Sequence, residues 1–125
     1  MIKRKSMRKG QVWMVDLGLV AKLRPCLLLT GFPSDEELAL VTVVAHTTAL
    51  KGSPWELNIQ KPFLRKGAFH LQQIHSIPLS AFVRFLGELK IDEMKKVEQK
   101  IVERFDLKEM ILGERQGGYP WHRKK

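Results

Sequence analysis

Two short apolar segments of the chain each carry reactive polar side chains at one end. Arg24 opens the first segment, and His46, Thr47 and Thr48 close the second, which is rich in valine. If the two segments are neighbouring antiparallel strands, the start of one lies beside the end of the other. A guanidinium, an imidazole and two hydroxyls would then meet at one rim of a sheet, and such groups can hold and cleave a phosphodiester.

The sequence does not contain the motifs that other nuclease or nucleotide-hydrolysis mechanisms require. There is no glycine-rich phosphate loop, no zinc-type spacing among the four histidines and the single cysteine, and no paired-carboxylate cluster. Any cleavage would therefore need no metal or other cofactor and would use the ribose 2′-hydroxyl as nucleophile. Arg24 suits the phosphorane intermediate, because its planar fork can grip two phosphate oxygens. Alternatively, Arg24 has a purely structural role and forms an ion pair with Asp16 or Glu56.

The polar residues that follow the second segment also have structural alternatives. Two threonines at a strand end are typical of turns, which we favour for Thr48, whereas Thr47 could donate a hydrogen bond to a phosphorane oxygen. His46 is a candidate acid–base catalyst or a core imidazole. Strand alternation places His46 and Thr47 on opposite faces unless the strand ends or bulges there.

Length and composition limit the class of protein. A chain of 125 residues is sufficient for one domain with a real core. Its single cysteine, Cys26, lies in an apolar segment, which indicates a core side chain. No apolar run approaches the roughly 20 residues that span a bilayer, and the basic N-terminus lacks the apolar stretch of a signal peptide. We expect a soluble cytoplasmic protein with no membrane partner.

The net charge of +9 is concentrated at the two ends of the chain. Nine basic residues and no acidic ones lie within residues 1–10 and 115–125, and they account for the whole excess. We therefore expect a basic arm over residues 1–9, a folded domain over 10–112 and a basic tail over 113–125. Such arms attract a polyanion in a salt-sensitive way, or simply aid solubility.

Hydrophobic periodicity and turn residues predict a mostly antiparallel β domain with a C-terminal helix, of the α+β class. The predicted strands cover residues 11–17, 25–30, 40–47, 55–59 and 68–76. The first of them is apolar enough to be covered on both faces. A short helix follows over residues 79–82, and residues 83–89 form a last strand or the tail of that helix. An amphipathic helix, capped by Asp92, runs to about Phe105. This arrangement fits a small barrel.

Several of these motifs together resemble the MazF/PemK family of toxins. They are, in order, Gly10–Leu17 (GQVWMVDL), Arg24-Pro25 before an apolar strand, Val43–Thr48 (VVAHTT) and Gln73-Ile74. The resemblance extends from about Met7 to Leu107. It implies a barrel of the Src-homology-three type (CcdB/MazF-like) with a C-terminal helix. It also implies a homodimer, a single-stranded RNA substrate and a cognate antitoxin whose acidic tail occupies the RNA groove.

The resemblance also assigns roles to particular residues. The family's conserved arginine falls on Arg24, its catalytic threonine on Thr47, and Thr48 takes the adjacent position. Some members carry an arginine and an aspartate two residues apart where this chain has His70 and Gln72. His70 is therefore a further candidate for proton transfer.

The sequence departs from the family pattern at two places. The common Asp-Gln-Ile-Arg series appears here as Gln72-Gln73-Ile74-His75, and the link before Arg24 is short. Lys61, Arg65 and other cations in two loops, with Phe63 among them, are typical of single-stranded RNA binding. The candidate substrate-binding residues are Thr48, Lys51, Lys66, Gln72, Gln73 and His75.

These observations predict a sequence-selective, metal-independent endoribonuclease toxin of a type II toxin–antitoxin system. Two alternatives stay open. One is a non-enzymatic toxin of the same fold, such as a CcdB-like gyrase poison, although that class lacks the Arg-Pro and strand-end threonine pair. The other is a nucleic-acid-binding module that has lost catalysis, which the departures at Gln72 and His75 favour.

Overall fold

The structure is a computed structural model, and it describes residues 3–18 and 22–112. In chain order the elements are η1 (Arg4–Ser6), β1 (Gln11–Asp16), β2 (Leu23–Leu28), β3 (Leu40–Thr47), β4 (Glu56–Leu57), β5 (Ala68–Pro78), η2 (Leu79–Ala81), β6 (Phe82–Glu88), α1 (Ile91–Arg104) and α2 (Lys108–Leu112). The predicted basic tail, 113–125, and residues 19–21 of the short link before Arg24 lie outside the described residues.

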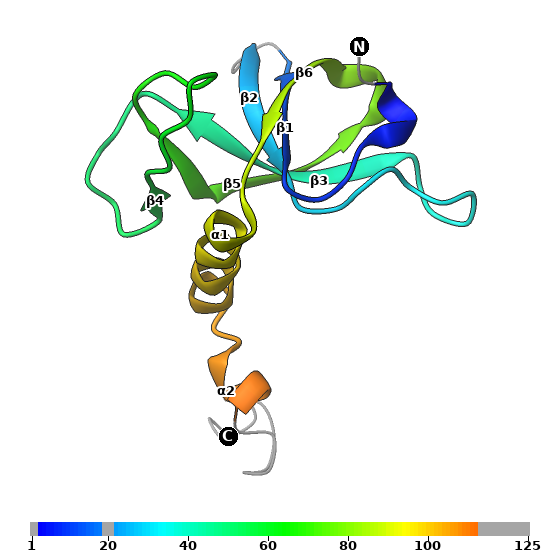
Figure 1. The fold of residues 1–125 in the computed structure, drawn as a ribbon. Helices are drawn as coiled ribbons and strands as arrows, with labels where there is room; N and C mark the ends of the chain where they lie inside the picture. The colour runs from blue at the N-terminus through cyan, green and yellow to red at the C-terminus, as the bar shows by residue number, and fades with distance from the viewer. Residues whose placement is uncertain (1–2, 19–21, 113–125) are drawn as a thin grey trace.

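The six strands form one antiparallel sheet in the order β4-β5-β3-β2-β1-β6. Helix α1 lies on the β5 side of the sheet, and α2 continues away from it (Figure 1). The predicted α+β class with a C-terminal helix is confirmed. The predicted barrel is open, because in the described part of the chain the end strands β4 and β6 pair with β5 and β1 and not with each other. No helix in this part is long and apolar enough to cross a membrane.

Most predicted strands are present, with shifted ends. β3 has the predicted bounds, β5 extends to Pro78, and residues 83–88 of the predicted segment 83–89 belong to the last strand, β6. The prediction for residues 55–59 was too long, since only Glu56–Leu57 pair with β5. Ile59 leaves the ladder and is buried in the core beneath α1 instead.

The predicted N-cap of the long helix was wrong. Helix α1 begins at Ile91, and its N-cap is Lys90. The Glu93 carboxylate accepts a hydrogen bond from the Lys90 backbone N–H at 2.7 Å, so this side chain satisfies the first turn. Asp92 lies inside the helix, where its charge is still favourable near the positive end of the helix dipole.

Both faces of the sheet are buried, as predicted for the first strand. Trp13 and Val15 of β1 belong to one core, which Phe82 of β6 and Met7 also enter. Val12 points to the opposite core, which α1 covers with its apolar face. Period-two alternation along β1 therefore supplies both cores from one strand.

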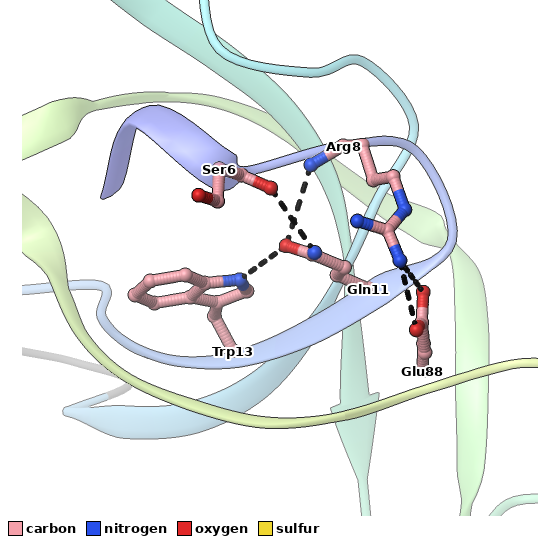
Figure 2. Close-up of polar contacts among 5 residues, drawn as sticks. All are labelled: Ser6, Arg8, Gln11, Trp13 and Glu88. Atoms are coloured by element: carbon pink, nitrogen blue, oxygen red, sulfur yellow. Dashed lines mark hydrogen bonds and ion pairs between the residues drawn. The ribbon is translucent and has the colours of Figure 1, made fainter. Parts of the chain in front are cut away.

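The N-terminal segment packs against the sheet. Met7 is buried, and the Arg4 guanidinium donates a hydrogen bond to the Phe82 carbonyl at 2.7 Å. Gln11 lies behind this segment with no exposed surface (Figure 2). Its side-chain oxygen, Oε1, accepts hydrogen bonds from the Trp13 indole N–H at 2.9 Å and from the Arg8 backbone N–H at 3.3 Å. Its amide donates to the Ser6 carbonyl at 3.2 Å.

Candidate functional site: a cationic cavity at the ends of β2 and β3

A cavity of about 700 Å³ opens where β2 begins and β3 ends. β2 and β3 pair antiparallel with Cys26 opposite Ala45, and continuing this register by two residues brings Arg24 beside Thr47. The predicted meeting of the two strand ends is therefore present. The polar side chains of the lining are Arg24, His46, Thr47, Thr48, Arg65 and Arg84. No carboxylate belongs to it.

Arg24 is half-buried, and no described residue forms an ion pair or hydrogen bond with its guanidinium. The two carboxylates that could have paired with it are engaged locally. Asp16 accepts from the Gly18 backbone N–H at 2.9 Å. Glu56 accepts from the backbone N–H groups of Lys51 and Gly52 at 2.7 and 3.1 Å. A partly desolvated guanidinium without an internal partner favours an external anion.

Thr47 has 5 % of its surface exposed, and its hydroxyl is oriented by the protein. The oxygen accepts a hydrogen bond from the Ala49 backbone N–H at 3.0 Å. This contact uses an acceptor position of the hydroxyl and leaves its proton available for a group bound in the cavity. Thr48, by contrast, is exposed at the cavity mouth.

His46 lines the same cavity although strand alternation would place it away from Thr47. The pairing of β3 with β5 is irregular between Val44 and His46, but the extra residues, 70–73, lie on β5. His46 therefore keeps the same face of β3 as Val44 and contacts Phe69, and it lines the cavity from the end of the strand. The imidazole is 4 % exposed and meets the Phe69 ring edge-on at 5.1 Å. Its Nε2 is the one buried side-chain N or O atom without a hydrogen-bond partner in the described part of the chain.

Burial, and secondly the nearby charge of Arg24, lower the pKa of His46 below its usual value. The imidazole is therefore neutral at neutral pH, which is the state that can accept a proton. Burial has the opposite effect on the neighbouring thiol. It raises the pKa of Cys26 to about 12, with Arg24 opposing, so Cys26 is an inert core side chain, as predicted.

Gly67 holds the end of β3 in place. A Cβ atom at this position would lie 2.2 Å from the Thr47 carbonyl oxygen and 2.9 Å from His46 Cε1. The backbone of β3 therefore packs directly on Gly67, and a side chain there would push Thr47 and His46 out of position.

Three further lining residues come from outside β2 and β3, and two of them, Phe63 and Arg65, belong to the cation-rich segment that the sequence analysis connected with RNA binding. Arg65 and Phe63 belong to the loop between β4 and β5, and Arg84 belongs to β6, where it pairs with Met14. Arg84 was missed entirely. An arginine within the otherwise apolar segment 82–86 was the available signal.

Six predicted site residues are not part of the cavity lining. They are His70, Lys51, Lys66, Gln72, Gln73 and His75. His70 pairs with Glu56 across the β4–β5 ladder, and its Nδ1 accepts from the Gln72 backbone N–H at 3.2 Å. Lys66 is exposed next to Arg65. Their roles stay predictions. Within residues 3–18 and 22–112, no three His, Cys, Asp or Glu side chains are arranged to hold a metal ion.

Comparison with known proteins places the chain in a family. The sequence model described as "PemK-like, MazF-like toxin of type II toxin-antitoxin system" matches residues 8–105. The chain belongs to this family, as its sequence motifs indicated. No curated protein sequence matched it significantly.

Solved structures share the fold at low sequence identity. An endoribonuclease in complex with its cognate antitoxin, from a mycobacterial species, is 22 % identical with a TM-score of 0.67, over 80 % of this chain and 95 % of that one. The Mycobacterium tuberculosis toxin MazF-mt6 is 25 % identical with a TM-score of 0.66, over 78 % and 97 %. A MazE–MazF structure from Deinococcus radiodurans is 19 % identical with a TM-score of 0.65, over 80 % and 96 %.

Proposed function

We propose that the protein is a metal-independent endoribonuclease that cleaves single-stranded RNA in this cavity, as the toxin of a type II pair. The observation that carries the proposal is the position of Arg24, which lies without an internal anion beside the oriented hydroxyl of Thr47. The names of solved structures with the same fold, which include endoribonucleases, support it. The family match does not favour a gyrase poison.

The geometry suggests a role for each group. Arg24 would hold the scissile phosphate and stabilise the charge of the pentacoordinate phosphorane. The Thr47 hydroxyl would donate a hydrogen bond to one phosphoryl oxygen. The 2′-hydroxyl would pass its proton to the neutral His46 imidazole and attack phosphorus. The P–O5′ bond would then break, with the 5′-oxygen taking a proton from solvent at the cavity mouth. The products would be a 2′,3′-cyclic phosphate and a 5′-hydroxyl.

The test is cleavage of a long single-stranded RNA in EDTA, with both ends of each fragment mapped. The wild type should leave 2′,3′-cyclic phosphate and 5′-hydroxyl ends. Arg24→Ala should cleave about 100-fold more slowly or worse, and Thr47→Ala about 10- to 100-fold more slowly. Arg104→Ala, which removes a cation on α1 outside the cavity, is the matched control and should cleave as the wild type does. Undiminished cleavage by Arg24→Ala would refute the proposal.

We further propose that the protein binds a cognate antitoxin, because structures with this fold are described as toxin–antitoxin complexes. We also propose that it acts in the cytoplasm. The cavity's three arginines and absent carboxylates would suit an acidic antitoxin segment. Such a complex should weaken steeply with added salt, which titration at several ionic strengths would measure. A salt-indifferent complex would contradict this binding mode. The homodimer stays a prediction.

A further inference from the structure

One wall of the cavity is the aromatic ring of Phe63, which rests on the backbone of β6. A Cβ atom at Gly87 would lie 2.4 Å from Phe63 Cε2 and 2.7 Å from its Cδ2. Only glycine at position 87 therefore allows the ring to approach the strand this closely. The ring is half-buried and also lines the cavity, so it is supported by the protein and accessible to a ligand.

The loop that carries Phe63 is anchored to helix α1. The Lys61 ammonium forms an ion pair with Glu93 at 2.8 Å, and the two side chains are only 11 % and 18 % exposed. The Leu64 backbone N–H donates to the Lys61 carbonyl at 3.0 Å, which closes a turn around Phe63. The aromatic ring is therefore held in place before any ligand binds, which lowers the entropic cost of binding.

Two guanidiniums accompany the ring. Arg65 follows Phe63 by two residues, and Arg84 lies on β6 three residues before Gly87. Both are exposed and line the cavity, and no ion pair or hydrogen bond engages either of their side chains within the described residues. An aromatic ring flanked by unpaired cations is a typical binding surface for a single-stranded nucleic acid.

We propose that Phe63, Arg65 and Arg84 form a nucleobase subsite beside Arg24 and Thr47, which stacks one unpaired base and prefers guanine or uracil. The inference rests on the proposed ribonuclease function and names a determinant of its sequence selectivity. Guanidinium groups only donate hydrogen bonds. On the base edge that carries the exocyclic group, guanine presents O6 beside N7 and uracil presents O4, all of them acceptors. Adenine and cytosine present an amine in place of this oxygen, which would face the guanidinium donors.

The stacking part is tested by binding of 2′-O-methyl RNA heptamers, which cannot be cleaved by 2′-hydroxyl attack. Phe63→Leu should raise the Kd about 10-fold or more, whereas Phe63→Tyr, which keeps a ring, should bind as the wild type does. Phe32→Leu removes a half-buried ring packed on the opposite core and is the matched control. Equal binding by Phe63→Leu and Phe32→Leu would overturn the proposal.

A second variant displaces the ring without removing it or altering charge. Gly87→Ala adds a methyl group within the space of Phe63, so it should also weaken heptamer binding by several-fold while thermal unfolding shows a folded protein. Wild-type affinity in a folded Gly87→Ala variant would count against the stacking platform, whatever happens to Phe63→Leu.

Base preference is tested with heptamers that differ at one central position. The wild type should bind guanine or uracil about 5-fold more tightly than adenine or cytosine, and Arg84→Gln should reduce this ratio toward one. Arg104→Gln removes the same charge on α1 and should keep the ratio. An unchanged ratio in Arg84→Gln would refute the assignment. A polyglutamate peptide provides a second check. If Phe63→Leu weakens binding of this peptide as much as binding of RNA, the assignment is also refuted, because the surface would then be a peptide-binding site.

The outcomes also separate this inference from the proposed function. Heptamer binding that depends on Phe63, in a protein that leaves natural RNA intact, would refute the ribonuclease and support the subsite. Cleavage that depends on Arg24, with heptamer binding indifferent to Phe63, would support the ribonuclease and refute the subsite.

Discussion

The polar contacts of Gln11 with Ser6, Arg8 and Trp13, here called the Gln11 network, and the cavity are two polar regions of the same sheet. The Gln11 side chain has hydrogen-bond partners inside the protein, whereas two polar groups of the cavity lack them within the part of the chain that the structure describes. Gln11 is fully buried, and its side chain is engaged with Ser6, Arg8 and Trp13 (Figure 2). In the cavity, His46 Nε2 is buried without a partner, and Arg24 has no anion among the described residues. The two regions adjoin, because Trp13 meets Phe85 of the cavity wall edge-on at 5.9 Å.

The difference indicates which polar groups serve the fold and which serve a ligand. A buried polar group without a partner costs about 1–3 kcal/mol of stability, and among the described residues this cost falls on His46 Nε2, whereas the Gln11 side chain has its partners inside the protein. Binding of an anion in the cavity would give the Arg24 guanidinium the partner that it lacks. We therefore interpret the Gln11 network as structural and the cavity as functional, and three predictions test that division.

The largest effect on stability should come from Gln11→Leu. It leaves the Trp13 indole N–H and backbone groups of Ser6 and Arg8 without their partner, which should lower the free energy of unfolding by about 2–4 kcal/mol. RNA cleavage should persist at temperatures where the variant is folded. Urea unfolding and the cleavage assay measure the two quantities. Gln60→Leu alters an exposed glutamine and should change stability by less than about 0.5 kcal/mol. A Gln11→Leu variant that is stable but inactive would contradict the assignment of Gln11 to the structure, because Gln11 would then be needed for activity.

A smaller effect is expected from Lys61→Met, which removes the ion pair that joins the Phe63 loop to α1. We expect a loss of about 1–2 kcal/mol, because Glu93 keeps its hydrogen bond from the Lys90 backbone N–H. RNA affinity should fall as well, since the loop supplies part of the cavity wall. Lys9→Met removes an exposed pair with Glu98 and should cost less than about 0.5 kcal/mol. Equal losses in the two variants would show that the loop anchor has no special role.

The smallest effect should appear in the pH dependence of stability. The folded-state pKa of His46 is lowered, first by burial and then by Arg24, whereas in the unfolded chain it is about 6.5. Between these values the unfolded chain binds more protons, so the free energy of unfolding should fall as pH drops below about 6.5. His46→Gln should flatten that part of the curve. His75→Gln, which removes an exposed imidazole, is the matched control. If the fall in stability below about pH 6.5 persists in His46→Gln, another group is responsible for it.

The sequence could predict one half of the cavity because that half depends on local patterns. The valine run that ends at Thr47 and the Arg-Pro start of β2 are strand signals, and antiparallel pairing brings their ends together. The same reasoning predicted both buried faces of β1. It failed at the first turn of α1, where the Glu93 side chain selected Lys90 over Asp92 as the N-cap.

The other half depends on contacts between distant segments. Phe63 reaches the cavity because Gly87 has no side chain, and Arg84 reaches it because β6 crosses to the far side of β1. Neither contact has a periodic pattern in the sequence. Gly67 is similar, since its role appears only when the backbone of β3 lies against it.

The most direct test follows side-chain resonances while a non-cleavable 2′-O-methyl RNA heptamer is added to the labelled protein. If the unpartnered groups of the cavity bind RNA phosphate, the imidazole signals of His46 and the guanidinium N–H of Arg24 should shift and saturate together. The side-chain amide of Gln11, already engaged by the protein, should stay where it is. Shifts confined to Gln11, or saturating RNA binding that leaves His46 and Arg24 unmoved, would contradict the account.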